Sequence, residues 1–191
     1  MSKLKFGTEE VIATVVATFL YVLLEWAQRA IAGDIFVPGA IYEFFKFRVL
    51  VVCVVAAIYG PVVGIIVAIG SAMIVNVMFY GYISPSEVVA YVINAFVIGY
   101  YSENFEVLKG NFKGKRIIDY NAIQFVINLF CSLIYTPLLF FIFEGRNLYE
   151  VVKLGIRSAV GNIVGVAIFG TIILVFISSI SEKRRAGQLF N

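Results

Sequence analysis

The stretch GIRSAVGNIVGVAIFGTIIL, residues 155–174, decides the class of fold. It is apolar over about 20 residues, the length that a helix needs to cross the hydrocarbon core of a membrane. Arg157 and Asn162 nevertheless stand within it, where hydrocarbon favours leucine or valine. A charged side chain inside a membrane span costs a few kcal/mol or more and is rarely kept without a task. The stretch therefore predicts a membrane helix whose two polar residues need an explanation.

Apolar runs of similar length recur along the chain. It has 191 residues, of which 61% are hydrophobic and 14% are charged, which is outside the range of soluble globular proteins. We therefore predict an all-α integral membrane protein that forms one six-helix domain over residues 1–191. The expected spans cover residues 10–31, 40–59, 62–80, 86–101, 120–143 and 148–181.

Several chemistries find little support in the sequence. Histidine is absent, and Cys53 and Cys131 lie in different apolar runs, so we expect no metal site, no resident cofactor and no disulfide. No glycine-rich loop with a lysine is present to hold the phosphates of a nucleotide. A catalytic carboxylate near the outer ends of the first two spans, where Glu25 and Glu43 lie, stays open as an alternative.

The lysines and arginines predict the orientation of the chain. In the six-span topology, nine basic residues fall on one side of the membrane, whereas basic and acidic residues are mixed on the other side. The positive-inside rule then places both termini and the basic loop 109–116 in the cytoplasm. We expect a multi-pass protein of the bacterial plasma membrane, without a nucleic-acid partner. The nine residues are Lys3, Lys5, Lys109, Lys113, Lys115, Arg116, Lys183, Arg184 and Arg185.

This topology sets the depth of the two polar residues in the last span. Counting about 20 residues back from Ser178 puts Ala159 at the outer boundary of the hydrocarbon. Arg157 then lies at the level of the headgroups, and Asn162 lies about one turn deeper. Arg157 either extends its guanidinium outward to water or clamps a ligand, and the sequence leaves both open. Asn162 needs a polar partner in the protein or in a cavity.

Polar residues recur in the outer parts of other spans. Such side chains normally face the interior of a helix bundle. They either hold the helices together by hydrogen bonds or line a small pocket that opens outward. As a set, they favour the pocket. The predicted substrate-binding residues are Asn76, Tyr80, Tyr91, Asn94, Gln124, Asn128, Arg157 and Asn162.

Small residues mark close contacts between helices. Gly161 and Gly165 form a GxxxG pattern in the last span, and Ala13 and Ala17 form an AxxxA pattern in the first. Such pairs let helix backbones approach closely in a bilayer. The pattern is common in apolar helices and does not by itself name a partner.

Four segments together resemble a known family. They are YGPVVGIIVAIGS (59–71), NVMFYG (76–81), YNAIQFVIN (120–128) with YTPLL after it, and the stretch 155–174. They resemble the substrate-binding S components of energy-coupling factor (ECF) transporters, in particular riboflavin-type and still-unassigned members. The resemblance extends over essentially the whole chain, and the last span is its most specific part.

The resemblance implies a function as well as a fold. S components have six helices with both termini inside, and they bind a vitamin or related micronutrient near the outer face. They associate with a membrane coupling protein and two ATPase subunits, so that ATP hydrolysis belongs to the partners and the chain itself is not an enzyme. An AxxxA surface on their first helix contacts the coupling protein, which here implies Ala13 and Ala17.

The chain also departs from the family pattern. Relatives often carry His, Lys and Asp near the outer end of the third span, where this chain has Ala72, Val75 and Asn76. Tyr91 stands where a tryptophan-rich start of the fourth span is typical. The identity of the ligand therefore does not transfer. A non-transporting membrane scaffold or assembly protein, in which the polar residues only join helices, is the alternative function.

Overall fold

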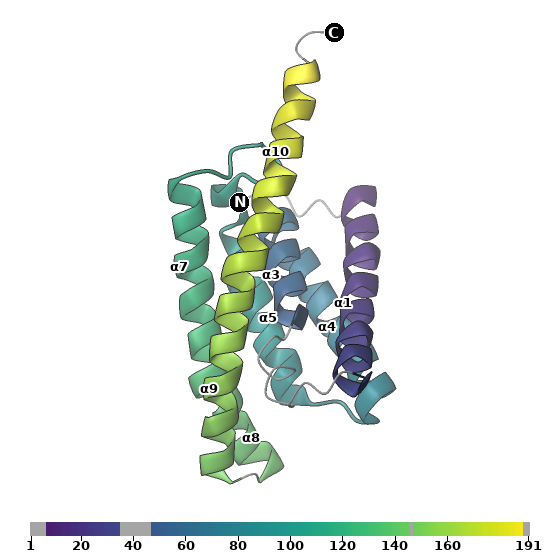
Figure 1. Ribbon diagram of the computed structural model, residues 1–191, viewed down its shortest axis with the longest axis vertical. Coiled ribbons are helices and arrows are strands. Elements are labelled where there is room, and N and C mark those ends of the chain that lie inside the picture. The colour runs from purple at the N-terminus through teal and green to yellow at the C-terminus, as the bar shows by residue number, and fades with distance from the viewer. Residues whose placement is uncertain (1–6, 35–46, 146, 189–191) are drawn as a thin grey trace.

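A computed structural model describes residues 7–34, 47–145 and 147–188, and all regular structure in these ranges is helical (Figure 1). Three of the long helices contain a short π-helical segment, labelled η. The elements are α1 (Thr8–Asp34), α3 (Phe47–Tyr59), α4 (Pro61–Val75) with η1 (Asn76–Tyr80), α5 (Pro85–Tyr100), α6 (Ser102–Phe105), α7 (Lys115–Phe130) with η2 (Cys131–Tyr135) and α8 (Thr136–Glu144), and α9 (Leu148–Gly165) with η3 (Val166–Gly170) and α10 (Thr171–Gln188).

Four helical segments in the described ranges are long and apolar enough to cross a membrane. They are Thr8–Ala30, Pro61–Tyr80, Lys115–Ile142 and Leu148–Gly187, and they correspond to the first, third, fifth and sixth predicted spans. The second and fourth predicted spans appear as shorter apolar helices, Phe47–Tyr59 and Pro85–Tyr100. At about 1.5 Å per residue, both are shorter than a bilayer core of roughly 30 Å. Residues 40–46 of the second predicted span lie outside the described residues.

The chain reverses sharply between α3 and α4, as Gly60-Pro61 predicts. Gly60 has a φ of 90°, a conformation that glycine adopts without the strain of a Cβ atom. Pro61 then opens α4, because its missing N–H belongs to the first turn, where no helical acceptor is needed. The turn lets α4 pack back against α3 and brings both helices against α5.

Helix α3 forms the centre of the molecule (Figure 1). It contacts α1, α4, α5, α6, α9, η3 and α10, and most of its residues are buried. A helix that is apolar on nearly all sides must be surrounded in this way. By contrast, α1 packs mainly on α3 and α4 and exposes the large apolar side chains of Val15, Phe19 and Trp26.

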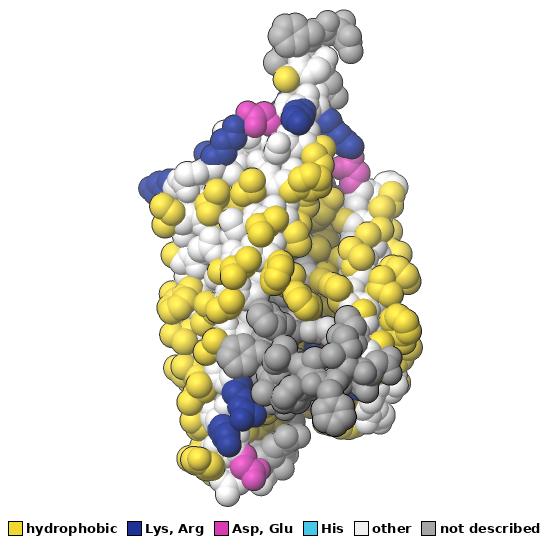
Figure 2. Space-filling view, in the orientation of Figure 1, with side chains coloured by type: hydrophobic (Ala, Val, Ile, Leu, Met, Phe, Trp, Pro, Cys, Tyr) yellow, Lys and Arg dark blue, Asp and Glu magenta, His cyan; other side chains and the backbone are white. Residues whose placement is uncertain are grey.

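The surface has the pattern of a membrane protein. Apolar side chains cover the flanks of the molecule, whereas lysine, arginine and acidic side chains gather toward its two ends (Figure 2). Exposed apolar residues of this number are stable only in contact with lipid or with another protein. The chain is therefore a multi-pass membrane protein.

The basic loop between α6 and α7 is bound to α10. The backbone N–H of Phe112 donates to Ser178 Oγ at 3.0 Å, and Lys113 Nζ lies 2.7 Å from Glu182 Oε1. Within the loop, Glu106 accepts hydrogen bonds from Asn111 and from Arg116, the latter at 2.6 Å. The bonds from Asn111 and Lys109, together with the positive charge of Arg116, hold the pKa of Glu106 below its usual range. These contacts join the loop, α7 and α10 at one end of the molecule.

Candidate ligand-binding site

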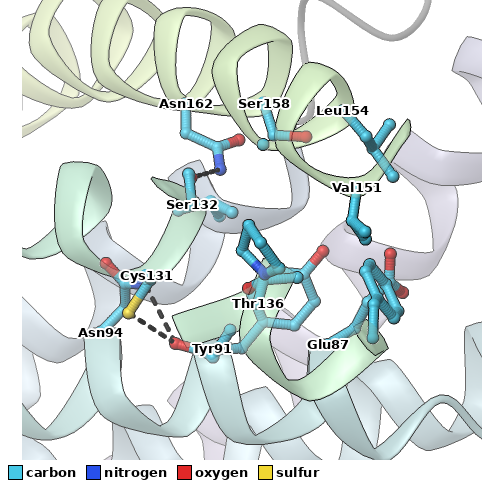
Figure 3. A pocket seen from close by; sticks show the side chains of 15 residues that line it. Glu87, Tyr91, Asn94, Cys131, Ser132, Thr136, Val151, Leu154, Ser158 and Asn162 are labelled. Atoms are coloured by element: carbon cyan, nitrogen blue, oxygen red, sulfur yellow. Dashed lines mark hydrogen bonds between the residues drawn. The ribbon is translucent and has the colours of Figure 1, made fainter. Parts of the chain in front are cut away.

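A cavity lies between α5, the η2–α8 segment and α9 (Figure 3). Helix α8 lies at the end of the molecule opposite the basic loop that precedes α7 (Figure 1). The volume of the cavity is about 50 Å³, enough for a few water molecules. The described lining residues are Val49, Glu87, Ala90, Tyr91, Asn94, Cys131, Ser132, Thr136, Pro137, Phe140, Val151, Leu154, Gly155, Ser158 and Asn162.

Helix α5 contributes one face to the cavity. Glu87, Tyr91 and Asn94 are spaced by four and three residues, so a single side of the helix carries all three. The Asn94 amide nitrogen donates to the Ala90 carbonyl oxygen at 2.9 Å. This bond fixes the side chain along its own helix.

Helix α9 contributes the opposite wall by the same periodicity. Val151, Gly155, Ser158 and Asn162 follow one another at intervals of four, three and four residues. The Asn162 amide nitrogen donates to Ser132 Oγ at 3.4 Å, so a polar contact joins α9 to η2 (Figure 3). The question raised by Asn162 in the apolar stretch 155–174 has a structural answer, because this residue faces both η2 and the cavity.

The third wall is shaped by the π-helical segment η2 and the proline after it. The Thr136 N–H donates to the Cys131 carbonyl, five residues back. Pro137 has no N–H to continue this register, so the Ser132 carbonyl lacks its helical partner. Gly155 packs directly over that carbonyl, and a Cβ atom at residue 155 would overlap it. Glycine is therefore the residue that lets α9 approach η2 this closely.

A buried cluster of charges lies beside the cavity. Arg48 Nη1 is 3.5 Å from Glu87 Oε2, and Arg48 Nε is 3.2 Å from Glu25 Oε2. Glu25 also accepts a hydrogen bond from Arg29 at 2.8 Å. Only 4% of Arg48 and 1% of Glu25 are exposed. The cluster ties α1, α3 and α5 together, because a buried charge must be paired.

Tyr91 connects this cluster with the cavity wall. The guanidinium carbon of Arg48 lies 6.0 Å from the centre of the Tyr91 ring, at the limit of a cation–π contact. The ring also meets Tyr21 of α1 edge to face, with 6.3 Å between centroids. Tyr91 is thus held from behind by α1 and α3, while it lines the cavity.

Three of the eight predicted site residues meet at this cavity, namely Tyr91, Asn94 and Asn162. Gln124 and Asn128 are buried in α7, where the Asn128 amide donates to the Gln124 backbone and side chain. Gln124 in turn reaches the Ile163 carbonyl at 3.5 Å. Gln124 and Asn128 therefore hydrogen-bond within α7 and to α9, as expected if such polar residues hold helices together instead of lining a pocket.

The other three predicted residues lie outside the described lining of the cavity. Asn76 is buried in η1. Tyr80 is 40% exposed, and its ring lies under the Arg29 guanidinium at 4.4 Å. The Arg157 side chain is exposed on α9.

The sequence prediction did not include several residues of the cavity. Glu87 is not among the predicted site residues, although its spacing from Tyr91 and Asn94 puts it on the same face of α5. Ser158 precedes Asn162 by one turn and gives the same kind of signal. Ser132 and Thr136 carry no distinctive pattern, because small hydroxyl residues are common in membrane helices.

Two further expectations concern metals and partners. In the ranges that the structure describes, no group of three or more His, Cys, Asp or Glu side chains is arranged to hold a metal ion.

Ala17 is only 4% exposed and belongs to the core of this chain, whereas Ala13 is half-buried. Of the AxxxA pair, Ala13 is thus the more accessible residue.

Comparisons with known proteins agree with this architecture. The chain matches the family model described as "ECF-type riboflavin transporter, S component" over residues 5–179. It is 26% identical to a UPF0397 protein of Lactobacillus johnsonii over 179 residues, 93% of each chain. It is also 26% identical to a UPF0397 protein of Streptococcus pneumoniae over 189 residues, 98% of each chain. A UPF0397 protein of Clostridium perfringens is 28% identical over 129 residues, 68% of each chain. No solved structure matches.

Proposed function

Because the chain belongs to the family of ECF-type riboflavin transporter S components, we propose that it captures a vitamin-like small molecule outside the cell for ATP-driven uptake by partner subunits. Members of this family are substrate-binding subunits of transporters and not enzymes. ECF transporter components and a small-molecule ligand are accordingly the partners that membership implies.

The cavity between α5, η2 and α9 is the observation that carries this proposal. Polar side chains from α5, η2 and α9 line it beside apolar ones, in a molecule whose flanks are apolar, and α8 at its border lies at the end of the molecule opposite the basic loop. With the basic loop in the cytoplasm, as the positive-inside rule predicts, the cavity lies in the outer half of the membrane. Capture from outside requires a site at that depth.

The volume of the cavity adds a condition. Sites for drug-sized ligands enclose roughly 300–1,000 Å³, whereas this cavity has about 50 Å³. A vitamin therefore enters only if α5 and α9 separate or if side chains between them rotate.

Riboflavin is the first molecule to test, since the family carries its name, but the departures at Ala72, Val75 and Asn76 make a different ligand equally admissible. The experiment is a thermal-unfolding screen of the purified protein with flavins, thiamin and its pyrimidine, pyridoxine, biotin, folates, cobalamins and queuosine precursors. A ligand that binds only the folded state raises the melting temperature by mass action. The proposal fails if neither this panel nor a cell extract raises it.

A further inference from the structure

The walls of the cavity present hydrogen-bond acceptors, and we infer that the site selects a nitrogenous group that donates hydrogen bonds, such as an amine, amidine or amino-heterocycle, over a carboxylate or phosphate. This inference rests on the proposed function and narrows the chemical class of its ligand.

Asn94 provides the first acceptor, and its orientation is fixed. Its amide nitrogen faces the Ala90 carbonyl, which can only accept, so the nitrogen and oxygen of the amide cannot be exchanged. The remaining oxygen, Oδ1, is buried without a hydrogen-bond partner in the described structure, and the residue is only 2% exposed. A buried acceptor of this kind normally has a partner, from a ligand or water where the protein supplies none.

A second acceptor comes from the facing helix α9. Asn162 uses its amide nitrogen on Ser132 Oγ, and its Oδ1 is likewise buried without a partner in the described part of the chain. The two oxygens belong to α5 and α9, which line opposite sides of the cavity.

The charge of the lining agrees with these acceptors. Glu87 is the carboxylate among the described lining residues, and these residues include no lysine or arginine. The nearby Arg48 pairs with Glu25 and Glu87, and Glu25 also pairs with Arg29, so the two arginines of this cluster are balanced by two carboxylates. The lining hydroxyls can donate to or accept from either class of ligand, so Glu87 and the two amide oxygens decide between them. A carboxylate or phosphate would face these acceptors unfavourably, whereas a protonated amidine would complement them.

An Arg157 clamp would favour the opposite class of ligand, since a guanidinium binds carboxylates and phosphates. The exposed Arg157 lies outside the described lining. The charge of the preferred ligand therefore distinguishes the two hypotheses.

The test uses acetamidinium and acetate as probes. Both are planar, with four non-hydrogen atoms and one methyl group each, and both are small enough for the cavity. Saturation-transfer NMR on the purified protein measures the binding of each methyl group. We expect acetamidinium to bind wild type more tightly than acetate does. In Asn94→Leu its affinity should fall by about tenfold or more, the effect of one lost hydrogen bond to a charged group.

Asn121→Leu is the matched control. Asn121 donates to the carbonyl four residues back at 2.9 Å, as Asn94 does, and also to Thr171 Oγ1 at 2.9 Å, but it lies on α7 outside the cavity lining. This variant should bind acetamidinium like wild type, and circular dichroism checks that both variants are folded. Preferred binding of acetate, equal binding by Asn94→Leu and wild type, or no binding of acetamidinium overturns the inference. If the vitamin panel still raises the melting temperature in those cases, the proposed function stands and only the ligand class is wrong.

Discussion

At the scale of the residue, Arg48 shows how a charge is kept inside an apolar helix. The sequence places it among VLVVCVV, and the structure surrounds it with Glu25 and Glu87. Breaking a buried pair by removing one partner costs about 3–5 kcal/mol, whereas replacing the whole pair by apolar groups is often tolerated. The consequence can be measured by comparing single and double variants.

We therefore predict that Arg48→Leu lowers the free energy of unfolding by about 3–5 kcal/mol, since it leaves buried carboxylates without this counter-charge. The double variant Arg48→Leu with Glu25→Leu should recover part of that loss. Thermal and denaturant unfolding in detergent measure both. A double variant less stable than Arg48→Leu would show that the two residues stabilise the protein independently.

A second prediction at this scale concerns Asn162. Asn162→Leu should abolish the rise in melting temperature caused by a ligand from the screen, because a lost polar contact in a desolvated site costs about 1–3 kcal/mol. Arg157→Gln is the companion variant. Its side chain is exposed and outside the described lining, so the ligand-induced rise should persist. Loss of the rise in Arg157→Gln instead would support the clamp.

At the scale of the element, the cavity depends on how closely α9 approaches η2. Gly155 packs on the Ser132 carbonyl and Pro137, whereas an added Cβ atom at Gly165 would meet nothing within 4 Å. The two glycines lie on the same helix, ten residues apart. Replacing each of them by alanine separates the effect of packing on stability from the effect of helix propensity.

Gly155→Ala should destabilise the protein by about 1–3 kcal/mol and weaken ligand binding, because the added methyl group pushes α9 away from η2. Gly165→Ala should be neutral or stabilising by roughly 0.5–1 kcal/mol, since alanine favours a helix over glycine. Unfolding and thermal-shift measurements on both variants test this. Equal stability of the two variants would mean that α9 adjusts without strain.

Helix α1 gives the prediction for partner binding. Ala17 is buried within this chain, so Ala17→Trp should disturb the fold itself. Ala13 is half-buried, and Ala13→Trp should prevent co-purification with the other ECF components and abolish uptake while ligand affinity stays near that of wild type. Retained uptake in Ala13→Trp would show that this face of α1 packs only inside the chain.

The helices also show which features of the structure the sequence can predict. Runs of apolar residues predicted the long helices of the described ranges, because a helix needs about 20 apolar residues to cross the bilayer core. Hydropathy cannot tell which way a polar residue points. Asn128 and Asn94 each donate to the carbonyl four residues back in their own helix, yet of the two only Asn94 is among the described lining residues of the cavity. The sequence also does not reveal the charge cluster around Arg48, because its carboxylate partners lie on other helices.

At the scale of the whole molecule, the two ends differ in construction. The cavity lies toward one end, whereas the opposite end joins the loop after α6 to α10 through Phe112, Lys113 and Glu182. The aromatic rings of Phe105, Phe112 and Tyr120 pack edge to face beneath this loop. We therefore expect any opening of the cavity to leave the contacts at the loop end in place.

Low pH should destabilise the end of the molecule that carries the basic loop. Hydrogen bonds from Asn111 and Lys109 and the charge of Arg116 lower the pKa of Glu106 below its ordinary value of 4.5. The stabilisation is therefore fully present above about pH 4.5 and is lost as the pH falls through the lowered folded-state pKa. Glu106→Gln should make the melting temperature less sensitive to acid in this range. The same acid sensitivity in Glu106→Gln and wild type would assign the effect to other groups.

The segment η2 has a consequence for insertions and deletions. A π-helical turn holds more residues than an α-helical turn, and each residue of an α-helix advances the chain by about 100° around the axis. Removing one residue from Cys131–Tyr135 would let the α-helical register continue into α8. Thr136, Pro137 and Phe140 would then rotate away from the cavity that they line. The number of residues in η2 therefore determines the shape of this wall as much as their identity does. Related chains that are one residue longer or shorter here should bind different ligands.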